Sequence, residues 1–98
     1  MHANLTSGKI KEGQIENFIS IYESSVKPVV TAIPGLVNLF VLTNKDKSEG
    51  LIIAIYGNQE DAEKAQKDGH FQQALGTLAS TLVIESISRG SYDVSVHI

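Results

Sequence analysis

The sequence has no cysteine and no tryptophan, a single arginine and two prolines among its 98 residues. The absence of cysteine excludes disulfide bonds, thiolate metal ligands and thiol nucleophiles. It is compatible with a reducing compartment, and the expected location is the cytoplasm. The lysines are scattered, Arg89 is alone and the net charge is −3, so nucleic acid is not an expected partner.

Membrane and leader signals are also lacking. The first residues, MHANLTSGKI, have no basic region followed by an apolar stretch, so no signal peptide is evident. The longest apolar runs are far shorter than the roughly 20 residues that a membrane span needs. No internal repeat occurs, and the length predicts one domain over residues 1–98 with one modest core.

The first half of the chain predicts a strand and then a helix. Residues 2–10 alternate weakly, and residues 11–13 form a turn. From Gln14 the apolar residues fall at helical spacing and make one face, which consists of Ile15, Phe18, Ile19, Tyr22 and Val26. Pro28 is expected to end or break this helix, since it lacks an amide donor. Pro34 and Gly35 then stop the segment.

The middle of the chain predicts a β-hairpin. Residues 36–43 and 51–56 are the two strands, and the polar residues 44–50 join them. Both strands are apolar on both faces, which is typical of strands covered on both sides. The helices can cover only one face, so we expect a homodimer joined sheet to sheet. The alternative is a monomer with an exposed apolar face, although large apolar patches are rare on monomers.

The last third predicts a helical region and a final strand. Asn58 is a candidate N-cap, with Asp61 three residues later. Asp68 and Gly69 interrupt the helix, which then resumes with an apolar face. Residues 82–87 fit either the end of this helix or a strand. Residues 89–91 read as a turn, and residues 92–98 alternate cleanly as a terminal strand.

The predicted order is therefore β-α-β-β-α-β. This is the ferredoxin-like α+β plan, in which a four-stranded antiparallel sheet carries its helices on one face.

The residues after the third strand resemble a known family. An aromatic residue, Tyr56, ends the strand, the polar turn GNQED follows, and the helix reads EKAQKDGHFQQAL with His70 and Phe71 in it. This arrangement is similar to antibiotic biosynthesis monooxygenase (ABM)-like domains, which are dimeric α/β barrels, and it covers nearly the whole chain. Tyr56 replaces the usual tryptophan and Ala65 the first of two histidines.

The resemblance also separates branches of that family. The haem-degrading branch has a tryptophan and an iron-ligating histidine where this chain has Ala65 and Leu75, so haem degradation is not expected. Quinol- and anthrone-oxidising members need no metal or flavin, because the deprotonated substrate supplies electrons to oxygen. The resemblance thus implies a cofactor-independent monooxygenase for a small phenolic, quinol or anthrone-type compound. The alternative is a non-enzymatic dimeric barrel that binds a small molecule or has a role in a stress response or in regulation.

Two residues are the candidate catalytic groups. His70 would accept a proton from a phenolic or enolic substrate, since the ordinary pKa of histidine lies near 6.5; otherwise it caps a helix or lies at the surface. Tyr56 would hydrogen-bond a substrate oxygen; otherwise it is an ordinary aromatic at a strand end with its hydroxyl at the rim.

Four further residues are candidate substrate contacts. Tyr22 lies on the apolar helix face and could reach the same cavity, or else pack in the core or at the dimer rim. Asn58 serves either as a cap or as a ligand contact. Phe18 and Phe71 are expected to form core or pocket wall. No metal site is expected, because nothing in the spacing favours a cluster of His2, His97 and a carboxylate. No GxSxG pattern supports hydrolase chemistry.

Overall fold

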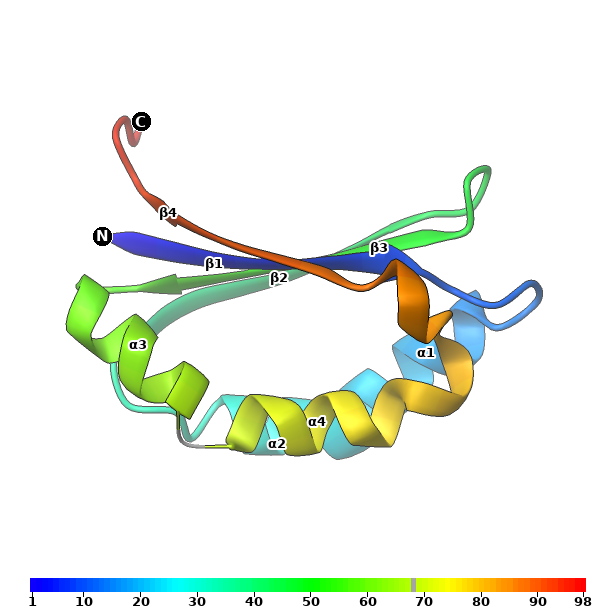
Figure 1. The fold of residues 1–98 in the computed structure, drawn as a ribbon. Coiled ribbons are helices and arrows are strands. Elements are labelled where there is room, and N and C mark those ends of the chain that lie inside the picture. The colour runs from blue at the N-terminus through cyan, green and yellow to red at the C-terminus, as the bar shows by residue number, and fades with distance from the viewer. Residues whose placement is uncertain (68) are drawn as a thin grey trace.

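The structure, a computed structural model, describes residues 1–67 and 69–98, and for residues 70, 71, 74 and 75 it describes the backbone alone. Its strands form one sheet in the order β2-β3-β1-β4, and every neighbouring pair is antiparallel. The helices lie on one face of this sheet (Figure 1). The ferredoxin-like prediction is therefore confirmed. The strands are β1 (His2–Lys9), β2 (Leu36–Asn44), β3 (Glu49–Tyr56) and β4 (Ser88–Asp93).

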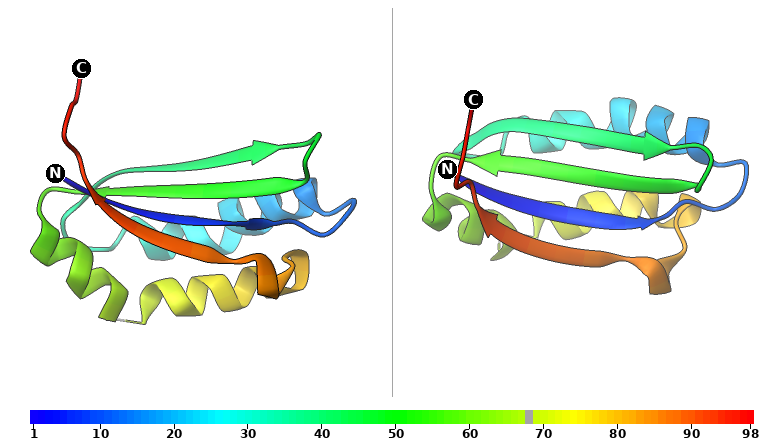
Figure 2. Two further views of the ribbon diagram at one scale, coloured as in Figure 1. Left: turned by 45° about the horizontal axis from the view of Figure 1, so that its top comes forward. Right: turned by 90° about the horizontal axis from the view of Figure 1, so that it is seen from above.

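The helical layer has two parts, and in the right-hand view of Figure 2, which looks down on the sheet, both parts lie behind the strands. The first contains α1, the π-helical turn η1 and α2. The second contains α3, α4 and two short 3₁₀ turns, η2 and η3. None of the described helices is long and apolar enough to span a membrane. Their bounds are α1 (Ile15–Ile21), η1 (Tyr22–Val26), α2 (Lys27–Val30), α3 (Gln59–Lys67), α4 (His70–Leu78), η2 (Ala79–Thr81) and η3 (Ile84–Ser86).

Strand β3 is central and apolar on both faces, as the sequence predicts. Its helix-side residues Ile52, Ala54 and Tyr56 are buried, and its other face stays half-buried. Strand β2 pairs with it from Leu36↔Tyr56 to Asn44↔Glu49 across a bulge near Val37. The sheet face away from the helices is rich in exposed apolar residues, which include Phe40, Leu42 and Tyr92.

Pro28 does not end the first helix, contrary to one of the two outcomes expected for it. The proline has no N–H to continue the α-helical pattern, and its ring crowds the preceding turn. The chain widens there into the π turn η1, in which the Lys27 N–H reaches the Tyr22 carbonyl, and the helix then continues as α2. Residues four apart drift by about 40° around an ordinary α-helix. The wider turn reduces that drift, so Phe18, Tyr22, Val26 and Val30 all stay buried.

The start of α3 confirms the predicted cap. The Asn58 Oδ1 accepts the Asp61 backbone N–H at 2.8 Å. The predicted break between the two helices involves Asp68, which lies outside the described residues, and Gly69. Gly69 has a positive φ of 76° and precedes α4. Such a conformation is open to glycine at little cost, and it separates the two helices.

The prediction for the C-terminus is wrong in position. The expected turn at 89–91 lies inside β4, and only Tyr92 and Asp93 of the expected strand 92–98 are paired. The neighbouring strand β1 determines the limits of β4, because the two strands pair from Ser7↔Ser88 to His2↔Asp93. Residues 82–87 hold one isolated bridge, Ile10↔Leu82, and the turn η3.

Gly35 is a position where only glycine fits. Its φ is +80°, and a Cβ placed on it would lie against the Asp61 side chain. We expect Gly35→Ala to lower the free energy of unfolding by about 2 kcal/mol or more, since it adds both backbone strain and a clash. Gly57→Ala is the matched control, because nothing lies within 4 Å of its Cβ. Urea unfolding of both variants checks this, and equal losses would contradict it.

Candidate functional site

A cleft opens between the first helical region and the edge strand β2. Its volume is about 580 Å³, which is within the usual range for a small-molecule site. The bulge and the inward-facing residues of β2 form one wall, and α1, η1 and α2 form the other. The lining residues are Ile19, Tyr22, Glu23, Lys27, Val30, Thr31, Leu36, Val37, Asn38, Leu39, Val41 and Thr43.

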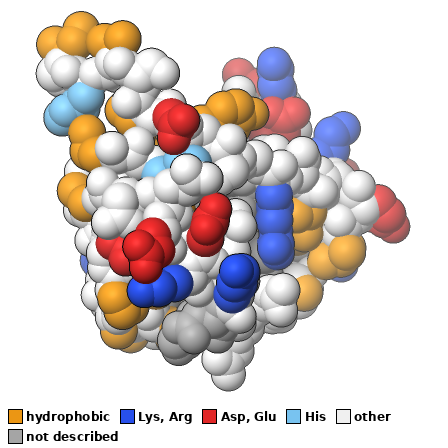
Figure 3. All heavy atoms as spheres, turned by 60° about the vertical axis from the view of Figure 1, so that its left-hand side comes forward, with side chains coloured by type: hydrophobic (Ala, Val, Ile, Leu, Met, Phe, Trp, Pro, Cys, Tyr) orange, Lys and Arg blue, Asp and Glu red, His pale blue; other side chains and the backbone are white. Residues whose placement is uncertain are grey.

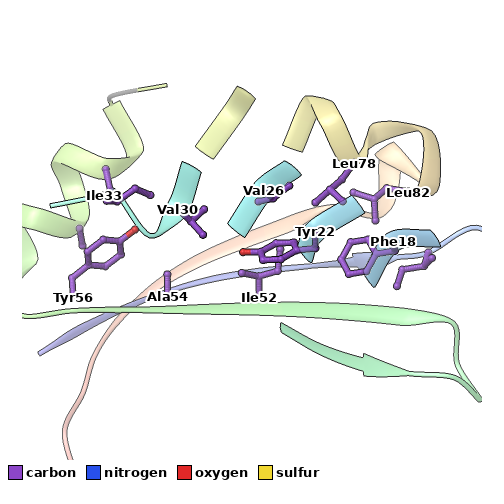
Figure 4. Close-up of a cluster of buried hydrophobic side chains, with 13 residues drawn as sticks. Phe18, Tyr22, Val26, Val30, Ile33, Ile52, Ala54, Tyr56, Leu78 and Leu82 are labelled. Carbon is purple, nitrogen blue, oxygen red and sulfur yellow. The ribbon is translucent and has the colours of Figure 1, made fainter. Parts of the chain in front are cut away.

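Two tyrosine hydroxyls are buried in the interior, that of Tyr22 beside the cleft and that of Tyr56 beyond the residues that line it. Tyr22 is 6 % exposed and Tyr56 is fully buried. Neither hydroxyl has a hydrogen-bond partner among the described residues. Figure 4 shows the two hydroxyls directed toward one another along the interior, with Val30 and Ala54 between them. Buried polar groups are nearly always hydrogen-bonded, so two buried hydroxyls without a protein partner are an exception that needs an explanation.

Burial also sets the protonation of these groups. It raises the pKa of Tyr22 to about 12, and the nearby Tyr56 adds to the increase. Burial likewise raises the pKa of Tyr56 above its usual 10. A raised pKa keeps a phenol protonated. Both tyrosines are therefore hydrogen-bond donors at neutral pH rather than proton acceptors.

The other predicted site residues lie at different places. Phe18 is buried behind Tyr22, with ring centroids 6.4 Å apart and planes tilted by 40°, and it does not line the cleft. Asn58 uses its side-chain oxygen as the α3 cap. His70 and Phe71 stand at the start of α4, but their side chains lie outside the described part. Of the predicted site residues with described side chains, only Tyr22 lines the cleft, whereas Tyr56, Phe18 and Asn58 do not.

The rim of the cleft holds residues that the sequence reasoning missed. Glu23 and Lys27 pair across one turn, with Lys27 Nζ 3.4 Å from Glu23 Oε2. Thr31 and Thr43 add hydroxyls to the lining. The spacing of Glu23 and Lys27 by four residues was a visible signal, but such pairs are common on exposed helix faces. Only the position of β2 beside the helix shows that this pair faces a cleft.

A second polar cluster lies on the helix side of β1 and β4. The His2 Nδ1 is 3.1 Å from Asp93 Oδ1, and its Nε2 is 2.7 Å from Ser91 Oγ. The Ser91 hydroxyl donates to Asn4 Oδ1 at 2.8 Å, and the Asn4 amide donates to the Ala62 carbonyl at 3.3 Å. This series of hydrogen bonds therefore connects β4, β1 and α3.

This cluster resembles a Ser-His-Asp triad only in composition. Asn4 is oriented by the Ala62 carbonyl, so its oxygen faces Ser91 and takes the hydroxyl proton. His2 then serves Ser91 as a donor, whereas a nucleophilic serine needs a histidine that accepts its proton. Among the described residues, no group of three potential metal ligands gathers here or elsewhere. We assign the cluster a structural role.

The protein is therefore a small ferredoxin-like α+β domain with a cleft between its first helical region and an edge strand, and Tyr22 is part of the lining of that cleft. The sequence matches the antibiotic biosynthesis monooxygenase family over residues 1–76. That match covers most of the chain, and the protein belongs to this family. No curated protein matches the sequence.

Solved structures share the fold at low identity. SnoaB, a cofactor-independent oxygenase from Streptomyces nogalater, is similar with a TM-score of 0.77 and 13% identity, over 99% of this chain and 95% of that one. A conserved protein from Methanosarcina mazei Go1 is similar with a TM-score of 0.74 and 11% identity, over 93% of this chain and 89% of that one. Rv0793 from Mycobacterium tuberculosis has a TM-score of 0.73 and 9% identity, over 98% of this chain and 96% of that one. At such identities the likeness concerns the fold alone.

The raised pKa of Tyr22 predicts a loss of stability in alkali. Above the ordinary pKa near 10 the unfolded chain ionises this phenol, while the folded protein keeps it neutral up to about 12. Unfolding then releases a proton, so the free energy of unfolding falls by about 1.4 kcal/mol per pH unit in that window from Tyr22 alone. Tyr22→Phe should remove this part of the slope. Urea unfolding from pH 9 to 12 measures it, and parallel curves for the two proteins would contradict it.

Proposed function

We propose that the protein is a cofactor-independent oxygenase that oxidises a small phenolic, quinol or anthrone-type compound in the cleft beside Tyr22. The observation that carries this proposal is the pair of buried hydroxyls of Tyr22 and Tyr56, which lack partners among the described residues. Family membership supports the class of reaction. The description of SnoaB as a cofactor-independent oxygenase concerns that protein and sets a precedent for the fold.

The two tyrosines would hold the oxygen of the substrate. Both remain protonated, so each donates a hydrogen bond to a carbonyl or to a developing oxyanion. Stabilising the oxyanion makes loss of a substrate proton easier, and a buried donor acts more strongly than one in water. The apolar walls formed by Val30 and Leu39 would keep water away from the reactive anion.

The chemistry that follows involves dioxygen as the oxidant. For an anthrone, the deprotonated carbon gives electrons to O₂ and forms a bond to one oxygen atom. The CH₂ group becomes a carbonyl, and the second oxygen atom leaves with two protons as water. A base must accept the first proton, and His70 remains our candidate for it. The tyrosines cannot take that role while they stay protonated.

The alternative function is non-enzymatic binding of a similar molecule, including a role in stress. One feature of the described residues is compatible with the binding function. Tyr22 and Tyr56 are hydrogen-bond donors, and donors suit a ligand that carries acceptor oxygens. Under this alternative the same cleft holds a quinone or phenol without turnover. Fold alone does not decide between the two functions.

We further propose that the protein forms a homodimer through the sheet face opposite the helices. Phe40, Leu42 and Tyr92 on that face are 52 %, 46 % and 58 % exposed. The half-buried Leu51, Ile53 and Ile55 of β3 lie among them. An apolar face that spans strands from both edges of the sheet is rare on a monomer. A second copy presents the same surface and can cover it around a twofold axis.

Oxygen uptake tests the enzymatic proposal. Purified protein is supplied with a panel of anthrones, quinols and catechols, without added metal or flavin. Tyr22→Phe and Tyr56→Phe should each lower kcat/KM by about tenfold or more, since each removes one hydrogen bond made in the transition state. Neither change should lower the free energy of unfolding, because the lost hydroxyls have no partner in the free protein.

The matched control is Tyr92→Phe, which removes an exposed hydroxyl on the opposite sheet face and should leave the rate unchanged. Oxygen uptake that is insensitive to both cleft variants would overturn the proposal. Binding of these compounds that depends on Tyr22 and Tyr56, with no oxygen uptake, would favour the binding function instead.

A further inference from the structure

One row of helix residues, spaced four apart, runs along the cleft. The residues of this row are Ile19, Glu23, Lys27 and Thr31. In the right-hand view of Figure 2 the first helical region follows the β2 edge of the sheet. On an ordinary α-helix such a row drifts by about 40° at each step. The π turn η1 reduces this drift, so the whole row stays on the cleft.

The middle of this row holds the charges of the cleft. Among the described residues that line the cleft, Lys27 is the only cation and Glu23 the only anion. Lys27 Nζ lies 3.4 Å from Glu23 Oε2, which is long beside the roughly 2.8 Å of a strong charge-assisted hydrogen bond. A lysine ammonium has three donors, and Glu23 occupies one of them. Two donors of Lys27 therefore remain for a ligand at the rim.

The cleft thus presents hydrogen-bond donors at two depths. Tyr22 is buried and stays protonated, because burial raises its pKa to about 12, so it donates from the inner side. Lys27 donates from the rim, and its charge sits on a flexible four-carbon stem that can follow a ligand further than the shorter side chain of Glu23. The β2 wall, with Leu39 and Val41, is apolar. A flat aromatic ligand with acceptor oxygens at two places fits these features.

We infer that Lys27 determines specificity and that the cleft takes an aromatic acid, whose carboxylate binds the Lys27 ammonium while a ring oxygen accepts the Tyr22 hydroxyl. This inference rests on the proposed function and names its substrate class. The chain has a net charge of −3, so the protein as a whole repels an anion. A preference for an anionic ligand therefore has to come from a local cation. Glu23 holds Lys27 beside the cleft before the ligand binds.

A pair of matched ligands tests this specificity without any turnover. Anthraquinone-2-carboxylate and anthraquinone-2-carboxamide share one ring system and nearly one shape, and at pH 7 only the first carries a charge. Calorimetric titration at low salt gives the two dissociation constants. We expect the natural protein to bind the carboxylate about fivefold more tightly than the amide, the upper range for an exposed ion pair. Sodium chloride at about 0.5 M should bring this ratio toward one, because salt screens exposed charges.

Two variants of Lys27 separate its charge from its shape. Lys27→Gln removes the cation and leaves Glu23 alone at the rim. The ratio should then fall below one, because Glu23 repels the carboxylate and not the amide. Lys27→Arg keeps the charge and should keep the preference for the carboxylate. In both variants the affinity for the amide should stay within about twofold of the natural protein, since an intact cleft still binds the ring.

Lys64→Gln is the matched control. Lys64 pairs with Glu60, also four residues away and at 3.2 Å, on α3, and neither residue lines the cleft. The face of the molecule that carries α3 has acidic and basic side chains intermixed (Figure 3). This variant changes the net charge by the same amount as Lys27→Gln, yet its ratio should stay near fivefold. Lys27 and Lys64 are both exposed, so neither change should disturb folding.

The neutral amide separates failure of this inference from failure of the proposed function. If both compounds bind, Tyr22→Phe weakens them, and the ratio is near one or unaffected by Lys27→Gln, the role of Lys27 is overturned and the proposed function stands. A preference that Lys64→Gln abolishes as well overturns it too, because net charge then explains the result.

Binding of neither compound also overturns the inference, while oxygen uptake with the phenolic panel still tests the proposed function. A preference of about fivefold that Lys27→Gln reverses, and that Lys27→Arg and Lys64→Gln both keep, supports the inference.

Discussion

The covering of β3 on both faces is the constraint on which the rest of the structure depends. Ile52, Ala54 and Tyr56 fill the helix side, while Leu51, Ile53 and Ile55 point to the other side. Because side chains alternate along a strand, an apolar residue at nearly every position requires cover on two sides. The described helices supply one cover. The other sheet face remains apolar and exposed, which is why a second copy becomes part of the functional proposal.

The interior holds two kinds of buried polar group, those with protein hydrogen-bond partners and those without. His2 and Asn4 are buried, and each side chain has protein partners that tie β1 to β4 and α3. Thr81 is also buried and donates to the Leu78 carbonyl at 2.7 Å. The hydroxyls of Tyr22 and Tyr56 differ, since neither has such a partner among the described residues. An unpaired buried donor costs about 1–3 kcal/mol, and a ligand oxygen recovers part of that cost on binding.

The sequence predicted the elements better than it predicted their limits. The helical spacing, the polar loop of the hairpin and the Asn58 cap are local signals, and each is confirmed. Residues 92–98 alternate as a strand should, but a strand needs a neighbour, and β1 stops pairing at His2. Pro28 removed one hydrogen bond, and whether the helix stopped or widened depended on the packing of Val26 and Val30 against the core.

The candidate site was only partly visible in the sequence. Tyr56 could be named because the family pattern has an aromatic residue at the end of the third strand, and Tyr22 could be named because it lies on the apolar face of a predicted helix. Glu23, Lys27 and Thr43 could not, because a cleft depends on how far the helix stands from an edge strand. The roles of His70 and Phe71 rest on the family pattern and stay predictions.

The most direct measurement of the donor role is carbon-13 NMR of the tyrosines. In a Tyr92→Phe protein only Tyr22 and Tyr56 remain, and each is labelled at the ring carbon that bears the hydroxyl. An anthraquinone, which carries acceptor oxygens and is not oxidised further, is then added. If the two hydroxyls hold a ligand oxygen, both resonances shift as the compound binds, and Tyr22→Phe weakens the binding by about tenfold. Binding that leaves both resonances unchanged would contradict the assignment of the tyrosines to the ligand site.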